Sequence, residues 1–166
     1  MENDISLEFR EHARADETFD AFQLTGNDVM QLLAQFDSYG LWRMDVETGL
    51  VYWSLDVFKI HGLPYREGPV DVKSAIEAYH EDDREFLVSL LEDTVENKGG
   101  FRFVLRLKHR YHGYKLVKST GCYRINSSGR PEVYGTFSEF QTPKRAIASY
   151  SGSEDHAEIQ QIRRSA

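Results

Sequence analysis

The chain has 166 residues, of which 40% are apolar and 28% are charged, and its formal net charge is −7. This composition is typical of one soluble globular domain, and the acidic balance disfavours a general nucleic-acid binder. Apolar runs are far shorter than the roughly 20 residues that cross a bilayer, and the acidic N-terminus lacks the apolar region of a signal peptide. We therefore expect a cytoplasmic protein that binds neither nucleic acid nor membrane.

Residues 1–37 form the first predicted region. Apolar residues at positions i, i+3, i+4 and i+7 predict one face of a helix over 27–38, which Asn27 or Asp28 can cap. The face consists of Val29, Leu32, Leu33 and Phe36. These side chains need burial and precede the predicted sheet, so we expect a homodimer that forms through this region.

Short elements follow over residues 41–79. Two strands, 41–46 and 50–53, flank a turn with Gly49, where a positive φ is cheap. Ser54 can cap a short helix that ends at Gly62, and Asp71 can cap a second that runs to about residue 79.

The longest helix is predicted over 82–97, with Asp82 and Glu85 in the spacing of a capping box. Three strands follow at 101–110, 114–125 and 132–140, and mixed alternation near Gly121 suggests a bulge. The predicted fold class is α+β, with a five-stranded antiparallel sheet that has helices on one face. We place this domain at residues 38–142 and expect a flexible C-terminal tail over 143–166.

Acidic and basic residues gather in different segments of this domain. Segment 77–96 has eight acidic residues against one arginine, and segment 102–124 has seven basic residues and no acidic one. A solvated acidic helix beside a solvated basic hairpin explains this pattern, and the alternative is that one of these faces docks a charged partner.

Five short segments in this order resemble PAS domains of the PAS-3 subtype. They are residues 40–54, residues 58–64, residues 80–84 (with Glu81 in place of the family's proline), the turn at 112–114, and residues 129–136. The resemblance covers about residues 38–142. It implies the PAS fold and a sensory or protein-interaction module of bacterial signal transduction, without enzymatic activity. Output would pass through a separate partner, such as a histidine kinase or a response regulator.

Members of this family often hold a small ligand between sheet and helices, and often dimerise through N-terminal helices. The resemblance implies that such a pocket would be lined by Phe58, His61, Phe86, Leu90, Phe103, Leu105 and Phe137. Trp42 and Trp53 are expected to be structural, and Asp45 and Arg84 are expected to be polar anchors rather than catalysts.

This sequence lacks most of the residues that the known cofactors of the family require. Flavin adduct chemistry needs a cysteine in an Asn-Cys-Arg-Phe-Leu context, whereas Cys122 lies in a late strand, where we expect a small buried hydrophobe. Haem-binding relatives place an axial histidine on the long helix, but residues 82–98 contain none. His61 and His80 are expected to pack or bond locally at helix ends. Strand alternation puts His109 and His112 on opposite faces, so we expect no metal site and no cofactor.

Two other functions remain open at this point. A small α+β enzyme, an isomerase or a dehydratase, would need a buried carboxylate beside a histidine, and no such pair stands at a convincing spacing. A ligand-free interaction scaffold is the other alternative, because large aromatic side chains can fill the pocket.

Overall fold

The computed structural model describes residues 5–8, 17–111, 113–141, 145–149 and 160–162. Its centre is an antiparallel six-stranded sheet in the order β3-β2-β1-β6-β5-β4. The strands are β1 (Tyr39–Asp45), β2 (Leu50–Trp53), β3 (Val70–Asp71), β4 (Gly100–Lys108), β5 (Tyr114–Ile125) and β6 (Pro131–Glu139). The α+β class and the antiparallel sheet are confirmed, but the sheet has six strands instead of five. The missed strand, β3, has only two residues, too few to show alternation.

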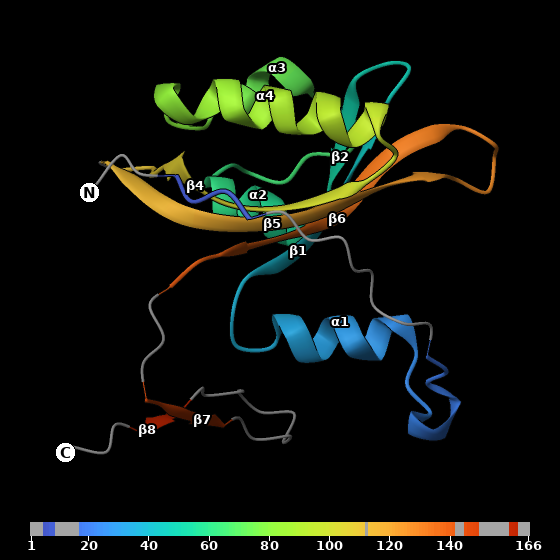
Figure 1. The fold of residues 1–166 in the computed structure, drawn as a ribbon. Helices are drawn as coiled ribbons and strands as arrows, with labels where there is room; N and C mark the ends of the chain where they lie inside the picture. Colours follow the sequence, from blue (N-terminus) through green and yellow to red (C-terminus); the bar gives the residue numbers. More distant parts are fainter. Residues whose placement is uncertain (1–4, 9–16, 112, 142–144, 150–159, 163–166) are drawn as a thin grey trace.

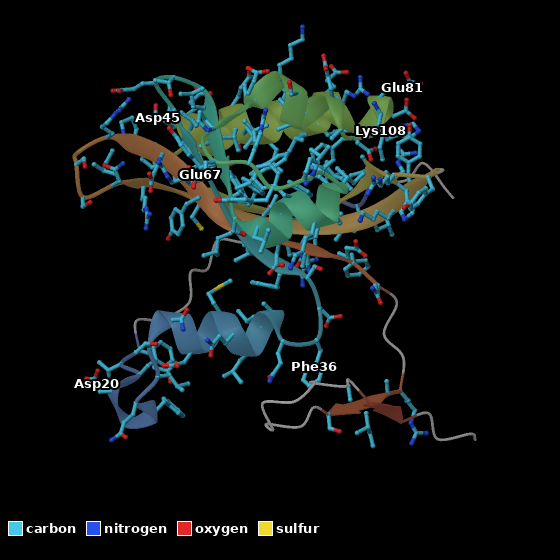
Figure 2. The ribbon with its side chains drawn as sticks, turned by 180° about the vertical axis from the view of Figure 1, so that it is seen from behind. Asp20, Phe36, Asp45, Glu67, Glu81 and Lys108 are labelled. Atoms are coloured by element: carbon cyan, nitrogen blue, oxygen red, sulfur yellow. The ribbon has the colours of Figure 1, made fainter. Side chains whose placement is uncertain are left out.

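Three helices cover one face of this sheet (Figure 1): α2 (Leu55–His61), α3 (Val72–Glu77) and α4 (Glu81–Glu96). Their apolar side chains meet the inward-facing residues of the strands, and Figure 2 shows side chains from both layers filling the space between them. The alternation predicted for β4 is confirmed, since Phe101, Leu105 and Leu107 are buried. The buried core therefore lies between the sheet and α2–α4.

Helix α1 (Gly26–Ala34) follows a short 3-10 helix, η1 (Asp20–Phe22), and lies on the other side of the sheet from α3 and α4 (Figure 1). Its apolar stripe is uncovered: Val29, Leu32, Leu33 and Phe36 are each at least 43% exposed. Phe36 lies beyond the helix end, in the segment that leads to β1 (Figure 2). Among the helices in the described part of the chain, none has the length and apolar character needed to cross a membrane.

Two predicted helix caps are wrong by two or three residues. At α1, Thr25 caps, because its Oγ1 accepts from the Asp28 N–H while Asp28 Oδ2 accepts from the Thr25 N–H at 2.7 Å. At α4, His80 caps, since its Nδ1 accepts from the Asp82 N–H at 3.2 Å. Asp71 caps α3 as predicted. Ser54 precedes α2 without a side-chain cap, and its hydroxyl accepts from the Leu41 N–H instead.

The predicted bulge near Gly121 is wrong, because the register of β5 is unbroken against both neighbours. The alternation looks irregular because small residues occupy inward positions. Gly121 pairs with Gly135 of β6, and the rings of Trp42 and Phe101 lean over Gly121 and stack at 6.1 Å between centroids. Gly121 thus makes room for the two rings, whereas a Cβ on Gly135 would meet the backbone of β5.

The outer edge of β4 is partly covered by the segment between α3 and α4. The His80 N–H donates to Arg106 O, and the Lys108 N–H donates to Ala78 O, both at 2.9 Å. Asp83, at the start of α4, accepts from the backbone and the guanidinium of Arg106 at 2.6–3.0 Å. Burial raises the pKa of Asp83, but the bonds and the charge from Arg106 outweigh it and hold that pKa below its ordinary value.

Much of the predicted tail lies outside the described residues. Its described part contains a two-stranded antiparallel sheet of β7 (Ile147–Ser149) and β8 (Gln160–Ile162). These strands are absent from our predicted elements, because three-residue strands are too short to show a pattern.

Candidate functional site

A cavity of about 60 Å³ lies between the sheet and the helices. It is lined by Trp42 and Met44 of β1, Val51 and Trp53 of β2, Val57 and His61 of α2, Val72, Ala75 and Ile76 of α3, Tyr79 of the segment between α3 and α4, Leu87 and Leu91 of α4, Phe101 and Phe103 of β4, Ser119 of β5, and Phe137 of β6. The lining is almost wholly apolar, as is usual for sites that bind small molecules.

The cavity lies where two groups of buried side chains meet. One group surrounds Leu107 and Val117, and the other surrounds Met44 and Val133. The partly buried side chains that pack against both groups are Trp42, Trp53, Leu91 and Phe103, and all four line the cavity.

His61 is the one titratable imidazole in the lining. Its ring stacks between Trp53, at 4.1 Å, and Phe137, at 5.1 Å. Nδ1 donates to Val57 O at 2.8 Å, and among the described residues Nε2 is the single buried side-chain nitrogen or oxygen without a hydrogen-bond partner. Burial lowers the pKa of His61 to about 4, against the effect of the bond to Val57, and the charge of Lys115 lowers it further. The imidazole is therefore neutral at pH 7.

Other polar side chains of the lining are hydrogen-bonded within the protein or uncharged. Trp42 Nε1 donates to Ser119 Oγ at 3.0 Å and to Thr136 O at 3.2 Å, and Ser119 Oγ donates to Thr136 O at 2.9 Å. Burial raises the pKa of Tyr79, so its phenol stays protonated. The lining thus carries no charge at neutral pH.

Three of the seven predicted pocket residues, His61, Phe103 and Phe137, line the cavity. Phe58 and Leu105 are buried in the core without lining the cavity, and Leu90 packs against the group of buried side chains around Met44 and Val133. The placement of Phe86 in the pocket is wrong: its side chain is 51% exposed on the outer side of α4. The neighbouring residue Leu87 points inward and lines the cavity in its place.

The sequence reasoning missed most of the lining. Trp42 and Met44 stand at alternate positions of β1, and Val51 and Trp53 do so in β2, so the period of two gave a usable signal there. In α3 the lining residues Val72, Ala75 and Ile76 stand at i, i+3 and i+4, which is also a usable signal for one face of a helix.

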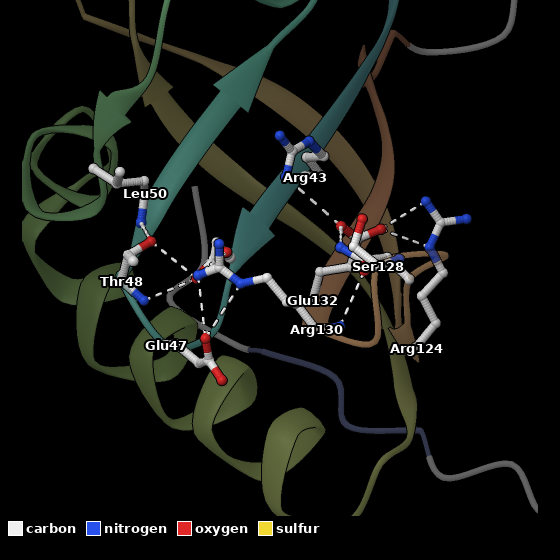
Figure 3. A network of polar contacts seen from close by, with 10 residues as sticks. Arg43, Glu47, Thr48, Leu50, Arg124, Ser128, Arg130 and Glu132 are labelled. Atoms are coloured by element: carbon white, nitrogen blue, oxygen red, sulfur yellow. Dashed lines mark hydrogen bonds and ion pairs between the residues drawn. The ribbon is translucent and has the colours of Figure 1, made fainter.

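A network of polar side chains connects β1, the end of β5 and the start of β6 (Figure 3). Glu132, only 2% exposed, accepts from Arg124 Nε at 2.6 Å and from Asn126 Nδ2 at 3.2 Å, and it pairs with Arg43 at 3.6 Å. Burial raises the pKa of Glu132, but these donors outweigh it and lower that pKa overall. The carboxylate of Glu132 is thus paired with cations from two other strands, and this arrangement fixes the strands in place.

The predicted polar anchors are confirmed. Asp45 Oδ1 accepts from the Thr48 N–H at 2.9 Å, which lowers the pKa of Asp45, and Arg130 pairs with its other oxygen at 3.0 Å. Arg84 donates to the carbonyls of Tyr79 and Glu77, both at 3.1 Å.

The expectation for Cys122 is wrong: it is exposed, because its neighbour Gly121 takes the inward position and alternation turns Cys122 outward. His112 lies outside the described residues. No three histidine, cysteine or acidic side chains gather for a metal ion within the described ranges.

Comparison with known proteins places this architecture in a family. The family model described as PAS fold (PAS_3) matches residues 50–137, more than half of the chain. The chain belongs to the PAS family. The resemblance found in the sequence is thereby confirmed, and the cavity lies between the PAS sheet and its helices. No curated protein sequence matches the chain significantly.

Solved PAS structures are similar to this chain. A sensory box histidine kinase/response regulator from Burkholderia thailandensis is 26% identical, with a TM-score of 0.54, and the match covers 66% of this chain and 82% of that one. The N-terminal domain of a diguanylate cyclase with a PAS/PAC sensor from Marinobacter aquaeolei is 17% identical (TM-score 0.53, coverage 61% and 94%). A domain of a putative light and redox sensing histidine kinase from Haloarcula marismortui is 15% identical (TM-score 0.55, coverage 69% and 99%). The last two likenesses concern the fold alone.

Proposed function

We propose that this PAS protein is a sensory module of a signal-transduction system, in which the cavity is the sensing site. The observation that carries the proposal is the uncharged cavity between the PAS sheet and its helices. Concave, mostly apolar pockets of this kind are the usual place where proteins bind small molecules, which favours an occupant.

The cavity also limits what the occupant is. Its volume of about 60 Å³ is well below the roughly 150 Å³ of an engineered protein cavity that holds benzene. A flavin or a haem is several times larger than benzene, so we propose that neither is the cofactor. The exposed position of Cys122 also argues against a flavin adduct at that residue.

A binding role is favoured over the two alternatives. An enzyme of the isomerase or dehydratase kind needs a carboxylate beside its base, and none of the residues that line the cavity is acidic. A scaffold with a filled core has no cavity, whereas here the aromatic side chains stop short of closing it. We therefore propose a non-catalytic module.

We propose that the signal passes from this module through contacts with other protein chains. The exposed stripe on α1 is the proposed surface of a homodimer, because exposed apolar stripes of this kind are typical of interaction sites. The signalling partner is proposed to be a separate protein such as a histidine kinase or a response regulator, in keeping with the kinds of protein to which the chain is similar.

Native mass spectrometry of the freshly purified full chain, with an absorbance spectrum, tests the proposal. We expect a dimer that carries extra mass released on unfolding, and no visible absorbance band. A monomer of bare chain mass would contradict both the occupied cavity and the dimer.

A further inference from the structure

We propose that the cavity takes a small non-polar molecule, without charge and without hydrogen-bonding groups, and that it excludes polar molecules of the same size. The inference rests on the proposed function and deepens it, since it names the chemical class of the molecule that the cavity senses.

The polar side chains of the lining offer the cavity almost no hydrogen-bonding surface. Trp42 Nε1 donates to Ser119 Oγ at 3.0 Å, and both groups also donate to Thr136 O, at 3.2 and 2.9 Å. His61 Nδ1 donates to Val57 O at 2.8 Å, and His61 Nε2 is enclosed by protein with almost no accessible surface. A polar occupant would therefore lose its hydrogen bonds to water and gain none in return.

The lining also has nothing to hold an ion or a water molecule. Among the described residues that line the cavity none is acidic or basic except His61, whose buried imidazole is neutral at pH 7. Burying an ion without a counter-charge is costly. A buried water typically makes about three hydrogen bonds to the protein, and cavities with apolar walls stay dry. The lining therefore selects against ions and water alike.

Non-polar contacts are what the walls supply. Aliphatic side chains come from three different elements, namely Val51 of β2, Ile76 of α3 and Leu91 of α4. The rings of Phe101 and Phe103 stack at 5.7 Å between centroids and complete this part of the wall. A non-polar molecule that moves from water into such surroundings gains dispersion contacts and gives up no hydrogen bond. The walls therefore favour a non-polar occupant.

The volume sets an upper limit of size. The cavity holds about 60 Å³, whereas an engineered cavity of roughly 150 Å³ holds benzene. In proportion, the cavity has room for about two or three non-hydrogen atoms. A dissolved diatomic gas and a very short hydrocarbon are of this size, and benzene is too large.

Three probes separate polarity from size. Xenon is non-polar and small, methanol is small but polar, and benzene is non-polar but too large. Each is titrated into the full chain while ¹³C NMR follows the methyl groups that line the cavity, and hydrostatic pressure without gas gives the baseline for xenon. We expect saturable shifts with xenon and none with benzene. Methanol should bind at least about tenfold more weakly than xenon, because its hydroxyl finds no partner in the cavity.

Matched variants of α3 assign the binding to the cavity. Ala75 lines the cavity, so Ala75→Leu should fill it and abolish the saturable xenon shifts. Ser74→Leu adds a leucine at the neighbouring exposed position and should bind xenon within about twofold of the unaltered chain. If Ala75→Leu does not fold, the contrast among the three probes in the unaltered chain still decides.

The proposal would be overturned if xenon gave no saturable shift in the unaltered chain, or if methanol bound as tightly as xenon. Saturable binding of benzene would also overturn it, and so would a folded Ala75→Leu variant that still binds xenon. A bound mass in native mass spectrometry together with any of these results would leave the sensory function standing and refute only the ligand class. Bare chain mass together with saturable xenon binding would refute a retained occupant and leave the ligand class standing.

Discussion

His61 shows at the scale of one residue how packing determines chemistry. Two aromatic rings enclose the imidazole, and burial keeps it neutral. The charged group that lowers its pKa further is Lys115 on β5, whose ammonium pairs with Glu139 of β6 at 2.5 Å. The ring is thus held in a form that accepts a hydrogen bond over the whole neutral range.

A first prediction concerns pH. The folded-state pKa of His61 is about 4 and the unfolded value is near 6.5, so the unfolded state binds more protons between these values. Stability is therefore lost as pH falls from 6.5 towards 4, by roughly 2 to 3 kcal/mol between pH 7 and pH 4.5. Urea unfolding of His61→Phe at both pH values should show this loss reduced by that amount, while His109→Phe should keep it. An unchanged loss in His61→Phe would contradict the buried neutral imidazole.

A second prediction concerns Asp83 and Arg106, which hold α4 to the edge strand. Breaking a buried pair by removing one charge typically costs 3 to 5 kcal/mol, so we expect Asp83→Asn to lower the free energy of unfolding by about 3 kcal/mol. The folded pKa of Asp83 is below its ordinary value, so its contribution is present above about pH 4 and is lost as pH falls further. Urea unfolding at pH 7 and pH 3 checks both statements.

Glu85→Gln provides the matched control for Asp83→Asn. Glu85 is exposed on the same helix, and its change should stay within about 0.5 kcal/mol. Equal effects of the two substitutions would show that the ion pair contributes nothing specific.

Some roles of single residues could be predicted from the sequence and others could not. Asp45 and Arg84 act within a few residues of themselves, where sequence patterns indicate local turns and polar contacts. His80 was expected to bond locally, but its role as the cap of α4 was not predicted. Phe86 and Cys122 were misplaced because one position along a helix or strand decides between core and solvent. The unbonded Nε2 depends on segments far apart in the chain, so no local pattern signals it.

At the scale of elements, Gly121 of β5 leaves the space in which two aromatic rings pack. A Cβ on Gly121 would lie 2.6 Å from Phe101 Cζ and 3.0 Å from Trp42 Cζ2. Both rings line the cavity, so the absence of a side chain at Gly121 shapes this wall of the cavity.

A third prediction follows from this packing. Gly121→Ala should lower the free energy of unfolding by about 2 kcal/mol, since overpacking usually costs 1 to 3 kcal/mol. It should also shift the side-chain NMR signals of Trp42. Gly99→Ala is the matched control, because its Cβ would meet nothing within 4 Å, and it should be nearly neutral. Comparable melting temperatures for the two variants would contradict the role of Gly121.

The types and order of the main elements were accessible from sequence, and their ends were not. The long strands and α4 show clear periodicity, and β5 was predicted with its observed ends, Tyr114–Ile125. The caps at Thr25 and His80 were missed because several polar residues precede each helix and only the folded geometry selects one. The two-residue β3 exists because it pairs with β2, which is a tertiary effect.

At the scale of the whole molecule, the α1 stripe leads to a fourth prediction. Leu32 is 62% exposed, and a charge there should oppose burial in a dimer. Leu32→Glu should weaken dimerisation at least about tenfold, equivalent to 1.4 kcal/mol or more, as measured by sedimentation. Gln31→Glu adds the same charge at the neighbouring exposed position and should keep the dimer. A dimer that survives Leu32→Glu unchanged would exclude the stripe as the interface.

The architecture was predictable from the sequence because strand and helix patterns occur in one order that resembles one family. The size of the cavity was not, because it is the small volume left when many large rings pack together. The aromatic residues that suggested a filled core do fill most of it, and about 60 Å³ remains.

The two edges of the sheet bear on how this molecule avoids aggregation. At one edge, β3 offers only two residues of backbone, and at the other, segment 78–80 and Asp83 occupy the end of β4. Short or covered edges resist the addition of a foreign strand. Backbone pairing is therefore a poor route to association, and copies of the chain are left to meet through side chains. Side-chain contacts can be made and broken without disturbing the sheet, which suits a reversible signal better than a fused sheet would.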